Sequence, residues 1–90
     1  PNKVETFEEF IDIYNIKPEQ VLYMGDDIPD FHVMKLVGLP TCPQNAAPEI
    51  KEISTYISHI DGGKGCVRDV IEQVMKVQGK WMSHFDAKYD

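Results

Sequence analysis

Apolar residues recur along the first part of the chain at spacings that predict alternating helices and strands. Between residues 4 and 14 they fall three and four positions apart, which places them on one face of an amphipathic helix. Residues 21–24 form a short apolar run that predicts a strand buried on both faces, ended by Gly25. Helical spacing returns in residues 31–37, and Gly38 is a natural C-terminal cap for that helix.

The rest of the chain repeats this alternation in shorter segments. Residues 39–42 predict a short extended segment, although Pro40 removes a donor from the strand ladder. A brief helix begins at Pro48, and residues 56–58 predict the next strand. The longest helix covers about residues 66–78, and its apolar stripe is predicted to be buried: Val67, Val70, Ile71, Val74 and Val77.

Helices that alternate with strands predict an α/β fold with a Rossmann-like parallel sheet. Three strands amount to the C-terminal half of a doubly wound, three-layer domain, which we place at residues 1–78. Residues 79–90 form a C-terminal tail that is too apolar to trail in water, so we expect it to pack at a subunit interface or onto its own domain. Its apolar side chains are Trp81, Met82, Phe85 and Tyr89.

Composition and charge restrict the classes of function. The 90 residues are 42% hydrophobic and 27% charged, which is typical of one small globular domain. A net charge of -6 argues against nucleic acid or an anionic membrane as a partner, and no apolar run reaches the roughly 18 residues of a spanning helix. Cys42 and Cys66 lack zinc or disulfide spacing, so we expect small buried side chains in a reducing cytoplasm. The histidines, His32, His59 and His84, also lack ligand spacing.

Three carboxylates follow the first predicted strand within five residues, in the loop Gly25-Asp26-Asp27-Ile28-Pro29-Asp30. Such a cluster repels itself unless a positive group lies among the carboxylates. A hard divalent cation would meet that need, and Mg²⁺ typically takes one or two carboxylates together with substrate phosphate. The alternative is a solvated turn in which Asp26 or Asp27 caps a helix that begins at Pro29.

This acidic loop, residues 25–30, resembles the fourth motif of the haloacid dehalogenase (HAD) superfamily, commonly written GDDxxD. The resemblance implies a HAD-like phosphatase with Mg²⁺ as its cofactor and Asp26 as a direct metal ligand. Asp27 and Asp30 would be alternative ligands or supports for the metal and the lysine. The resemblance also gives Lys3 a catalytic role, with Asp30, as the lysine that offsets charge on the phosphoryl group. Taken alone, Lys3 would be a surface lysine, but it precedes helix, strand and acidic loop in the order of the superfamily.

A second loop, residues 61–69, places three glycines and two cations where a strand meets a helix. Such a junction can offer backbone N–H groups to an anion, although an ordinary glycine turn with solvated charges explains the pattern equally well. The spacing is not that of a Walker loop. The candidate substrate-binding residues are Gly62, Gly63, Lys64, Gly65 and Arg68.

Residues 62–69 read Gly-Gly-Lys-Gly-Cys-Val-Arg-Asp, and residues 78–81 read Gln-Gly-Lys-Trp. Together they resemble the C-terminal sequence of 3-deoxy-D-manno-octulosonate 8-phosphate (KDO 8-phosphate) phosphatases, usually GGxGAVRE and then QGxW or QGK. The departures are Lys64, Cys66 and Asp69, which stand where Arg, Ala and Glu are common. Lys64 would lose the bidentate grip that Arg has on a carboxylate or phosphate.

This second resemblance implies magnesium-dependent hydrolysis of a small sugar phosphate, KDO 8-phosphate, in lipopolysaccharide core biosynthesis, by a homotetramer. The family's nucleophilic Asp lies in a DxDG strand that has no counterpart here, because Asp12 and Asp86 lie in the wrong contexts. We therefore expect a fragment of a longer protein, inert by itself; the chain begins at Pro1 without an initiator Met. Two alternatives stay open: a phosphatase for another sugar-acid phosphate, such as a nonulosonate 9-phosphate, and a non-catalytic, oligomer-forming module.

Overall fold

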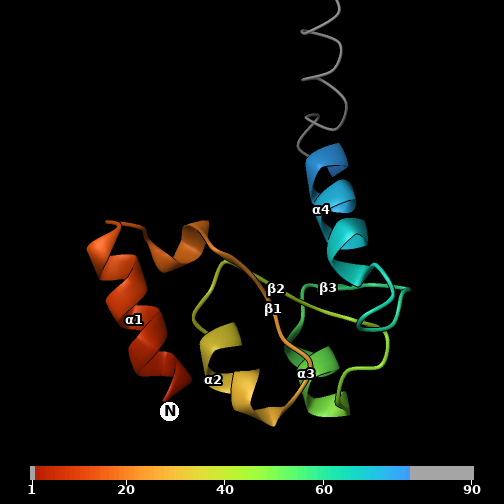
Figure 1. Ribbon diagram of the computed structural model, residues 1–90, viewed down its shortest axis with the longest axis horizontal. Coiled ribbons are helices and arrows are strands. Elements are labelled where there is room, and N and C mark those ends of the chain that lie inside the picture. The colour runs from red at the N-terminus through yellow and green to blue at the C-terminus, as the bar shows by residue number, and fades with distance from the viewer. Residues whose placement is uncertain (1, 78–90) are drawn as a thin grey trace, which may run out of the picture.

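The computed structural model describes residues 2–77, in which helices alternate with three short strands (Figure 1). The tail predicted at residues 79–90 lies outside this part. None of the helices within it has the length and apolar surface to cross a membrane. The elements, with η for a 3-10 helix, are α1 (Lys3–Ile13), η1 (Pro18–Gln20), β1 (Leu22–Met24), η2 (Ile28–Asp30), α2 (Phe31–Met34), β2 (Leu39–Cys42), α3 (Pro48–Ile53), β3 (Tyr56–Ile57) and α4 (Cys66–Val77).

The three strands form one parallel sheet whose spatial order, β1-β2-β3, is also the chain order. Leu22 pairs with Leu39, and Thr41 pairs with Tyr56, so the carboxyl ends of the strands meet at the same edge of the sheet. In Figure 1, α2 and α3 lie together below the strands, and α4 rises on the opposite side. This arrangement confirms the predicted α/β fold with a Rossmann-like parallel sheet.

The core lies where α2 and α3 pack against the sheet. Met34, Cys42, Ala46 and Ile50 form its buried cluster. Burying the larger of these side chains contributes roughly 1.5–3 kcal/mol each. This burial is the main stabilising term in so small a unit. Cys66 is buried as well, and both cysteines are free thiols, which confirms the expectation of small buried side chains.

β2 is the central strand of the sheet even though it contains Pro40. The proline has no N–H to donate, but its carbonyl accepts the Thr55 N–H at 2.8 Å. Its neighbour Thr41 is fully buried. The extended segment predicted at residues 39–42 is therefore confirmed as a strand.

α1 and β1 are less buried than their apolar patterns predict. Within the described residues no side chain of α1 is buried, and Phe10 is 53% exposed. Leu22 is 38% exposed, so the prediction that this strand is buried on both faces is wrong here. The reason is that β1 is an edge strand, which pairs only with β2 among residues 2–77. An open apolar groove of about 510 Å³ lies between α1 and β1.

The buried stripe predicted for the last helix is also partly wrong. Val70 is buried, but Val67, Ile71 and Val77 are 57%, 46% and 89% exposed. The physical reason is the direction of α4, which runs away from the sheet after its first turns (Figure 1). An apolar spacing shows which residues share a face but not whether a neighbour covers that face.

The helix predicted at residues 31–37 is shorter than expected, because α2 ends at Met34. Gly38 is therefore not its cap. Instead, Gly38 packs against η1, where the carbonyl of Glu19 occupies the space that a Cβ would need. The Gly38 N–H donates to the Pro18 carbonyl at 3.0 Å. A glycine at this position allows η1 to contact the start of β2.

Candidate active site

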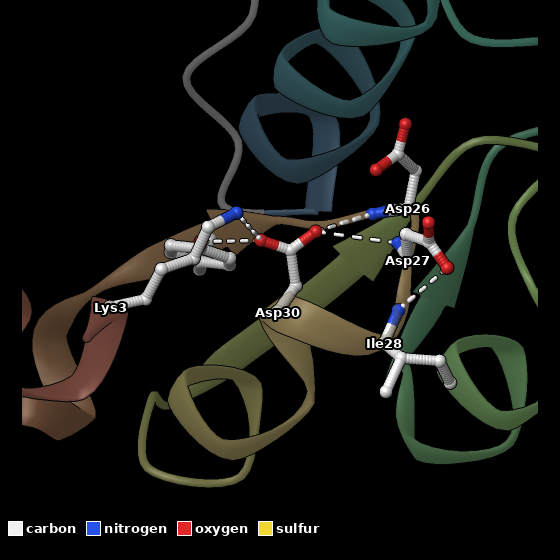
Figure 2. Close-up of polar contacts among 6 residues, drawn as sticks. Lys3, Asp26, Asp27, Ile28 and Asp30 are labelled. Carbon is white, nitrogen blue, oxygen red and sulfur yellow. Dashed lines mark hydrogen bonds and ion pairs between the residues drawn. The ribbon is translucent and has the colours of Figure 1, made fainter. Parts of the chain in front are cut away.

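The carboxylate of Asp30 is the centre of the acidic loop and is 5% exposed. Its Oδ1 accepts hydrogen bonds from the Lys3 ammonium and the Tyr23 hydroxyl, each at 2.8 Å. Its Oδ2 accepts the backbone N–H of Asp26 at 3.0 Å and that of Asp27 at 3.4 Å (Figure 2). One buried side chain thus joins the first turn of α1 to a loop 27 residues further along the chain.

Gly25 allows the loop to wrap closely around Asp30. A Cβ at Gly25 would lie 2.5 Å from the Cβ of Asp30 and 2.6 Å from the sulfur of Met34. Both distances are far shorter than a van der Waals contact, so only glycine fits between the end of β1 and the start of α2. Gly25, the glycine of the GDDxxD motif, is therefore needed for Asp30 to pack in this position.

Asp27 has a structural role in addition to its candidate role as a metal ligand. Its side chain accepts the Ile28 N–H at 2.8 Å and is the N-cap of η2, which has Pro29 in its first turn. The cap predicted for Asp27 is therefore present, on a 3-10 helix that begins at Ile28 and not at Pro29. Asp26 is not the cap, and its carboxylate points away from Asp30 (Figure 2).

The contacts around Asp30 determine which groups are charged. Burial acts to raise the pKa of the Asp30 carboxyl, but the hydrogen bonds from Lys3, Tyr23 and the loop N–H groups hold that pKa below its usual value. The hydrogen bond to Asp30 raises the pKa of the Lys3 ammonium. Burial, followed by the bond to Asp30, raises the pKa of the Tyr23 phenol. At neutral pH the cluster therefore holds a carboxylate, an ammonium and a neutral phenol.

Asp26 and Asp27 are exposed and line a polar cavity of about 450 Å³. The other lining residues are Asn45, Ala47, Gly62 and Gly63. Two of the candidate substrate-binding glycines therefore lie across a cavity from the two candidate metal ligands. This is the carboxyl edge of the parallel sheet, where ligands bind in α/β folds.

The other residues of the glycine loop point elsewhere. Gly65 and Arg68 line a separate depression of about 210 Å³, and Lys64 is exposed. Gly63 and Gly65 have φ angles of +80° and +100°, a backbone region that favours glycine. The structure thus brings Gly62 and Gly63 to the acidic loop and does not bring Gly65 and Arg68 there.

Most of the chain matches a known protein family. The family model described as haloacid dehalogenase-like hydrolase matches residues 1–67. The chain belongs to this family. The superfamily resemblance carried by residues 25–30 is therefore confirmed, and the parallel sheet is that of a haloacid dehalogenase-like protein.

Within this family, similar proteins include KDO 8-phosphate phosphatases. The phosphatase KdsC from Salmonella typhi is 39% identical over 79 residues, which are 88% of this chain and 42% of the relative. KdsC from Escherichia coli K12 is 38% identical over the same shares. The chain therefore spans less than half the length of these relatives, and over that length the predicted resemblance to the subfamily is confirmed.

Solved structures of related haloacid dehalogenase-like proteins share the fold. The KDO 8-phosphate phosphatase of Yersinia pestis has a TM-score of 0.85 and 34% identity, covering 91% of this chain and 44% of that one. The phosphatase of Moraxella catarrhalis has a TM-score of 0.86 and 27% identity, covering 99% and 51%. The latter crystal structure contains a magnesium ion, a phosphate ion and a KDO molecule.

The donor set of the acidic loop fits Mg²⁺ as part of a site. Asp26 and Asp27 offer carboxylate oxygens, the ligand type that Mg²⁺ prefers, beside a polar cavity. Asp30 differs, because both of its oxygens already accept hydrogen bonds from protein groups. Among residues 2–77, no group of three or more Asp, Glu, His or Cys could hold a metal ion. Two carboxylates are a usual protein contribution to a Mg²⁺ site, whose shell is completed by water and substrate phosphate.

Tyr23 and Asn45 belong to the site but do not stand out in the sequence. Tyr23 lies in the apolar run of β1, and the only signal was that a buried tyrosine needs a partner for its hydroxyl. Asn45 follows β2, and its Oδ1 accepts the Gly62 N–H at 2.9 Å. Its position just after the carboxyl end of a strand is the same signal that identified the acidic loop.

Asp69 is a second buried carboxylate, located in the first turn of α4 and 7% exposed. It accepts hydrogen bonds from the hydroxyls of Tyr56 and Ser58, both at 2.7 Å. One of its oxygens lies 3.6 Å from Nδ1 of the exposed His59. Burial acts to raise the pKa of Asp69, but these hydrogen bonds lower it. Burial and the bond to Asp69 raise the pKa of Tyr56 to about 12. Asp69 thus ties β3 to α4.

Proposed function

We propose that this chain is the metal-binding half of a phosphomonoester hydrolase. The observation that carries the proposal is the set of contacts around Asp30, which holds a lysine on one oxygen and the backbone of two further aspartates on the other. An ammonium held by the same carboxylate that orders the loop of Asp26 and Asp27, at the carboxyl edge of a parallel sheet, suits a phosphate that is bound with a divalent cation.

In this proposal, Asp26 and Asp27 would hold Mg²⁺, with Asp26 as a direct ligand. When bound, Mg²⁺ neutralises charge on the phosphoryl oxygens and orients the phosphate. The Lys3 side chain is 47% exposed, so its ammonium can approach a bound phosphate while Asp30 fixes its position. Asp30 itself acts by fixing the position of the Lys3 ammonium and by ordering the backbone of the acidic loop.

The proposed reaction of the full-length protein is hydrolysis of KDO 8-phosphate to KDO and phosphate. Two findings support this substrate: the relatives at 38–39% identity carry that activity in their names, and the related Moraxella structure contains magnesium, phosphate and KDO. The nucleophilic Asp and much of the substrate pocket would lie outside this chain, which covers 42% of its relatives.

The outer edge of β1 offers a place for the missing strand. Among residues 2–77, β1 pairs on one side only, and the apolar groove beside it is lined by residues that include Phe7, Val21 and Tyr23. A parallel strand at this edge would end next to Asp26, because parallel strands share their carboxyl edge. A nucleophile at that strand end would therefore face the candidate metal ligands.

Phosphate release by the full-length protein from KDO 8-phosphate tests the proposal. We expect turnover with Mg²⁺, loss of turnover with a chelator, and a fall of at least about 100-fold in kcat/KM for Asp26→Ala. Asp12→Asn is the matched control, because Asp12 is an exposed carboxylate near the end of α1. Wild-type activity in Asp26→Ala would show that the metal assignment is wrong.

The same assay separates the two alternatives. Faster turnover of a nonulosonate 9-phosphate than of KDO 8-phosphate would replace the substrate and keep the reaction class. No phosphate release from any sugar phosphate would favour the non-catalytic, oligomer-forming module.

The homotetramer and the cytoplasmic location stay predictions. The tail residues on which the assembly prediction depends lie outside the described part of the chain. Light scattering of the full-length protein with and without residues 79–90 measures the tail's contribution. A tetramer that persists after their removal would contradict a role of the tail at the interface.

A further inference from the structure

One side chain, Asn45, connects the glycine loop to the acidic loop. Its Oδ1 accepts the Gly62 N–H at 2.9 Å, a contact between positions 17 residues apart. The same segment is joined to the acidic loop, because the Ala47 N–H donates to the Asp26 carbonyl at 2.9 Å. Asn45 and these neighbours all line the polar cavity. The segment after β2 therefore bridges the two loops.

The first part of the glycine loop is held by other contacts. The Gln44 N–H donates to the Ile60 carbonyl at 3.0 Å, and the Ile60 N–H donates to the Ser58 hydroxyl oxygen at 3.0 Å. Ser58 is fully buried and donates in turn to Asp69. The chain is thus well anchored up to Ile60.

Beyond Ile60 the loop depends on fewer contacts. Gly63 and Gly65 adopt positive φ angles, and a Cβ at either position would meet no atom within 4 Å. Glycines lose more conformational entropy on ordering than other residues, so such a loop needs a specific contact to hold one position. Among residues 2–77, the hydrogen bond from Gly62 to Asn45 is the one that ties this stretch to another segment on the side of the cavity.

We infer that Asn45 is a positioning residue. Its Oδ1 holds the backbone of Gly62 and Gly63 against the cavity next to Asp26 and Asp27, and this backbone contacts the substrate there. This inference rests on the proposed phosphatase function. Loss of the contact frees the loop but leaves Lys3 and Asp26 in place. The expected effect is therefore weaker substrate binding with unchanged chemistry, which appears in KM and not in kcat.

Hydrogen exchange of the Gly62 amide in the full-length protein tests the contact without any assay of activity. In Asn45→Ala the acceptor is lost, and we expect the Gly62 amide to exchange about tenfold faster. Asn45→Asp is isosteric and keeps an acceptor oxygen, so exchange should stay within about twofold of wild type. Unchanged exchange in Asn45→Ala, or equal acceleration in both variants, would overturn the inference.

Steady-state kinetics with KDO 8-phosphate and Mg²⁺ test the consequence for the substrate. Asn45→Ala should raise KM about tenfold with kcat within about twofold of wild type, since one positioning contact is lost. Gln44→Ala is the control, because Gln44 is an exposed amide residue next in the chain that uses its backbone, not its side chain, to hold the loop. A fall in kcat at constant KM, or an equal effect of Gln44→Ala, would overturn the inference.

The two hypotheses fail in different ways. An inactive wild-type protein would contradict the proposed function, while the exchange rates of Gly62 would still report on Asn45. Conversely, an active protein in which Asn45→Ala changes neither Gly62 exchange nor KM would overturn only the role of Asn45.

Discussion

Asp30 and Asp69 are both buried carboxylates close to the strands of the same parallel sheet, yet their partners differ. They are 5% and 7% exposed, and hydrogen bonds lower the pKa of each. Asp30 is met by the ammonium of Lys3 and by backbone N–H groups of the acidic loop. Asp69 is met at 2.7 Å by the neutral hydroxyls of two side chains, Tyr56 and Ser58.

This difference shows that burial of a carboxylate does not by itself indicate a functional site. A buried charge needs partners wherever it occurs, and two hydroxyl donors, with the His59 ring 3.6 Å away, satisfy Asp69 as a structural tie. The partners of Asp30, in contrast, also face the solvent or the polar cavity. Lys3 remains half exposed, and the loop that Asp30 orders carries the free carboxylate of Asp26 toward a polar cavity.

The largest expected effect is that of Asp30→Asn on activity. The substitution removes the charge that fixes Lys3. It also places an amide NH₂, which is itself a donor, opposite either the loop N–H groups or the ammonium. We expect kcat/KM of the full-length protein with Mg²⁺ to fall by about 100-fold or more. Asp69→Asn is the matched control and should stay within about fivefold of wild type, because it contacts no residue of the polar cavity. Equal losses in the two variants would remove the distinction between the carboxylates.

Asp69→Asn should act on stability instead. Hydrogen bonds to a charged group contribute more than neutral ones, so we expect the free energy of unfolding to fall by about 2 kcal/mol. Chemical denaturation of the full-length protein with and without the substitution measures the change. An unaltered unfolding midpoint would show that Asp69 does not tie β3 to α4 energetically.

The two tyrosines allow a closely matched comparison. Tyr23 donates to Asp30 at 2.8 Å and Tyr56 donates to Asp69 at 2.7 Å, so a Phe substitution removes one similar hydrogen bond in each case. We expect Tyr23→Phe to lower kcat/KM about tenfold and Tyr56→Phe to lower the free energy of unfolding by about 1 kcal/mol without loss of activity. The reverse pattern in kinetics and denaturation would contradict the assignment of function to Asp30.

The smallest expected effect is a loss of stability at high pH that depends on Tyr56. Its pKa is raised from 10.0 to about 12, so the folded state holds the phenolic proton more tightly than the unfolded state. The stability contributed is complete below pH 10 and is lost as the pH rises toward about 12. Denaturation between pH 8 and about 11.5 should show this loss in wild type and a weaker one in Tyr56→Phe. Identical pH dependence in both would contradict it.

Much of the fold could be predicted because the relevant signals are local. Strand β2 and helix α3 begin where the sequence predicts, and Gly25 and Pro29 mark the turn between β1 and α2. Burial could not be predicted in the same way. Phe10 and Val77 lie on apolar faces, but the described residues provide no neighbour to cover them.

The same distinction applies to the candidate site: its local features could be predicted from the sequence, and its contacts between distant segments could not. The acidic loop and its lysine are recognisable from residue types in a fixed order, and the structure joins Lys3 to Asp30 at 2.8 Å. Tyr23 and Asn45 depend on contacts between segments that only the folded chain brings together. The separation of Arg68 from Gly62 depends on how the loop turns into α4, which residue spacing does not determine.

The placement of Lys3 on α1 links the proposed phosphate site to local unfolding. Within residues 2–77 the helix buries none of its side chains completely, so its detachment from α2 and Asp30 would expose little apolar surface. Lys3 would leave together with the helix, and Asp30 would lose its only cationic partner among the described residues. On these contacts, gentle heating would separate Lys3 from Asp30 while the sheet remains intact, so the proposed activity would be lost before global melting.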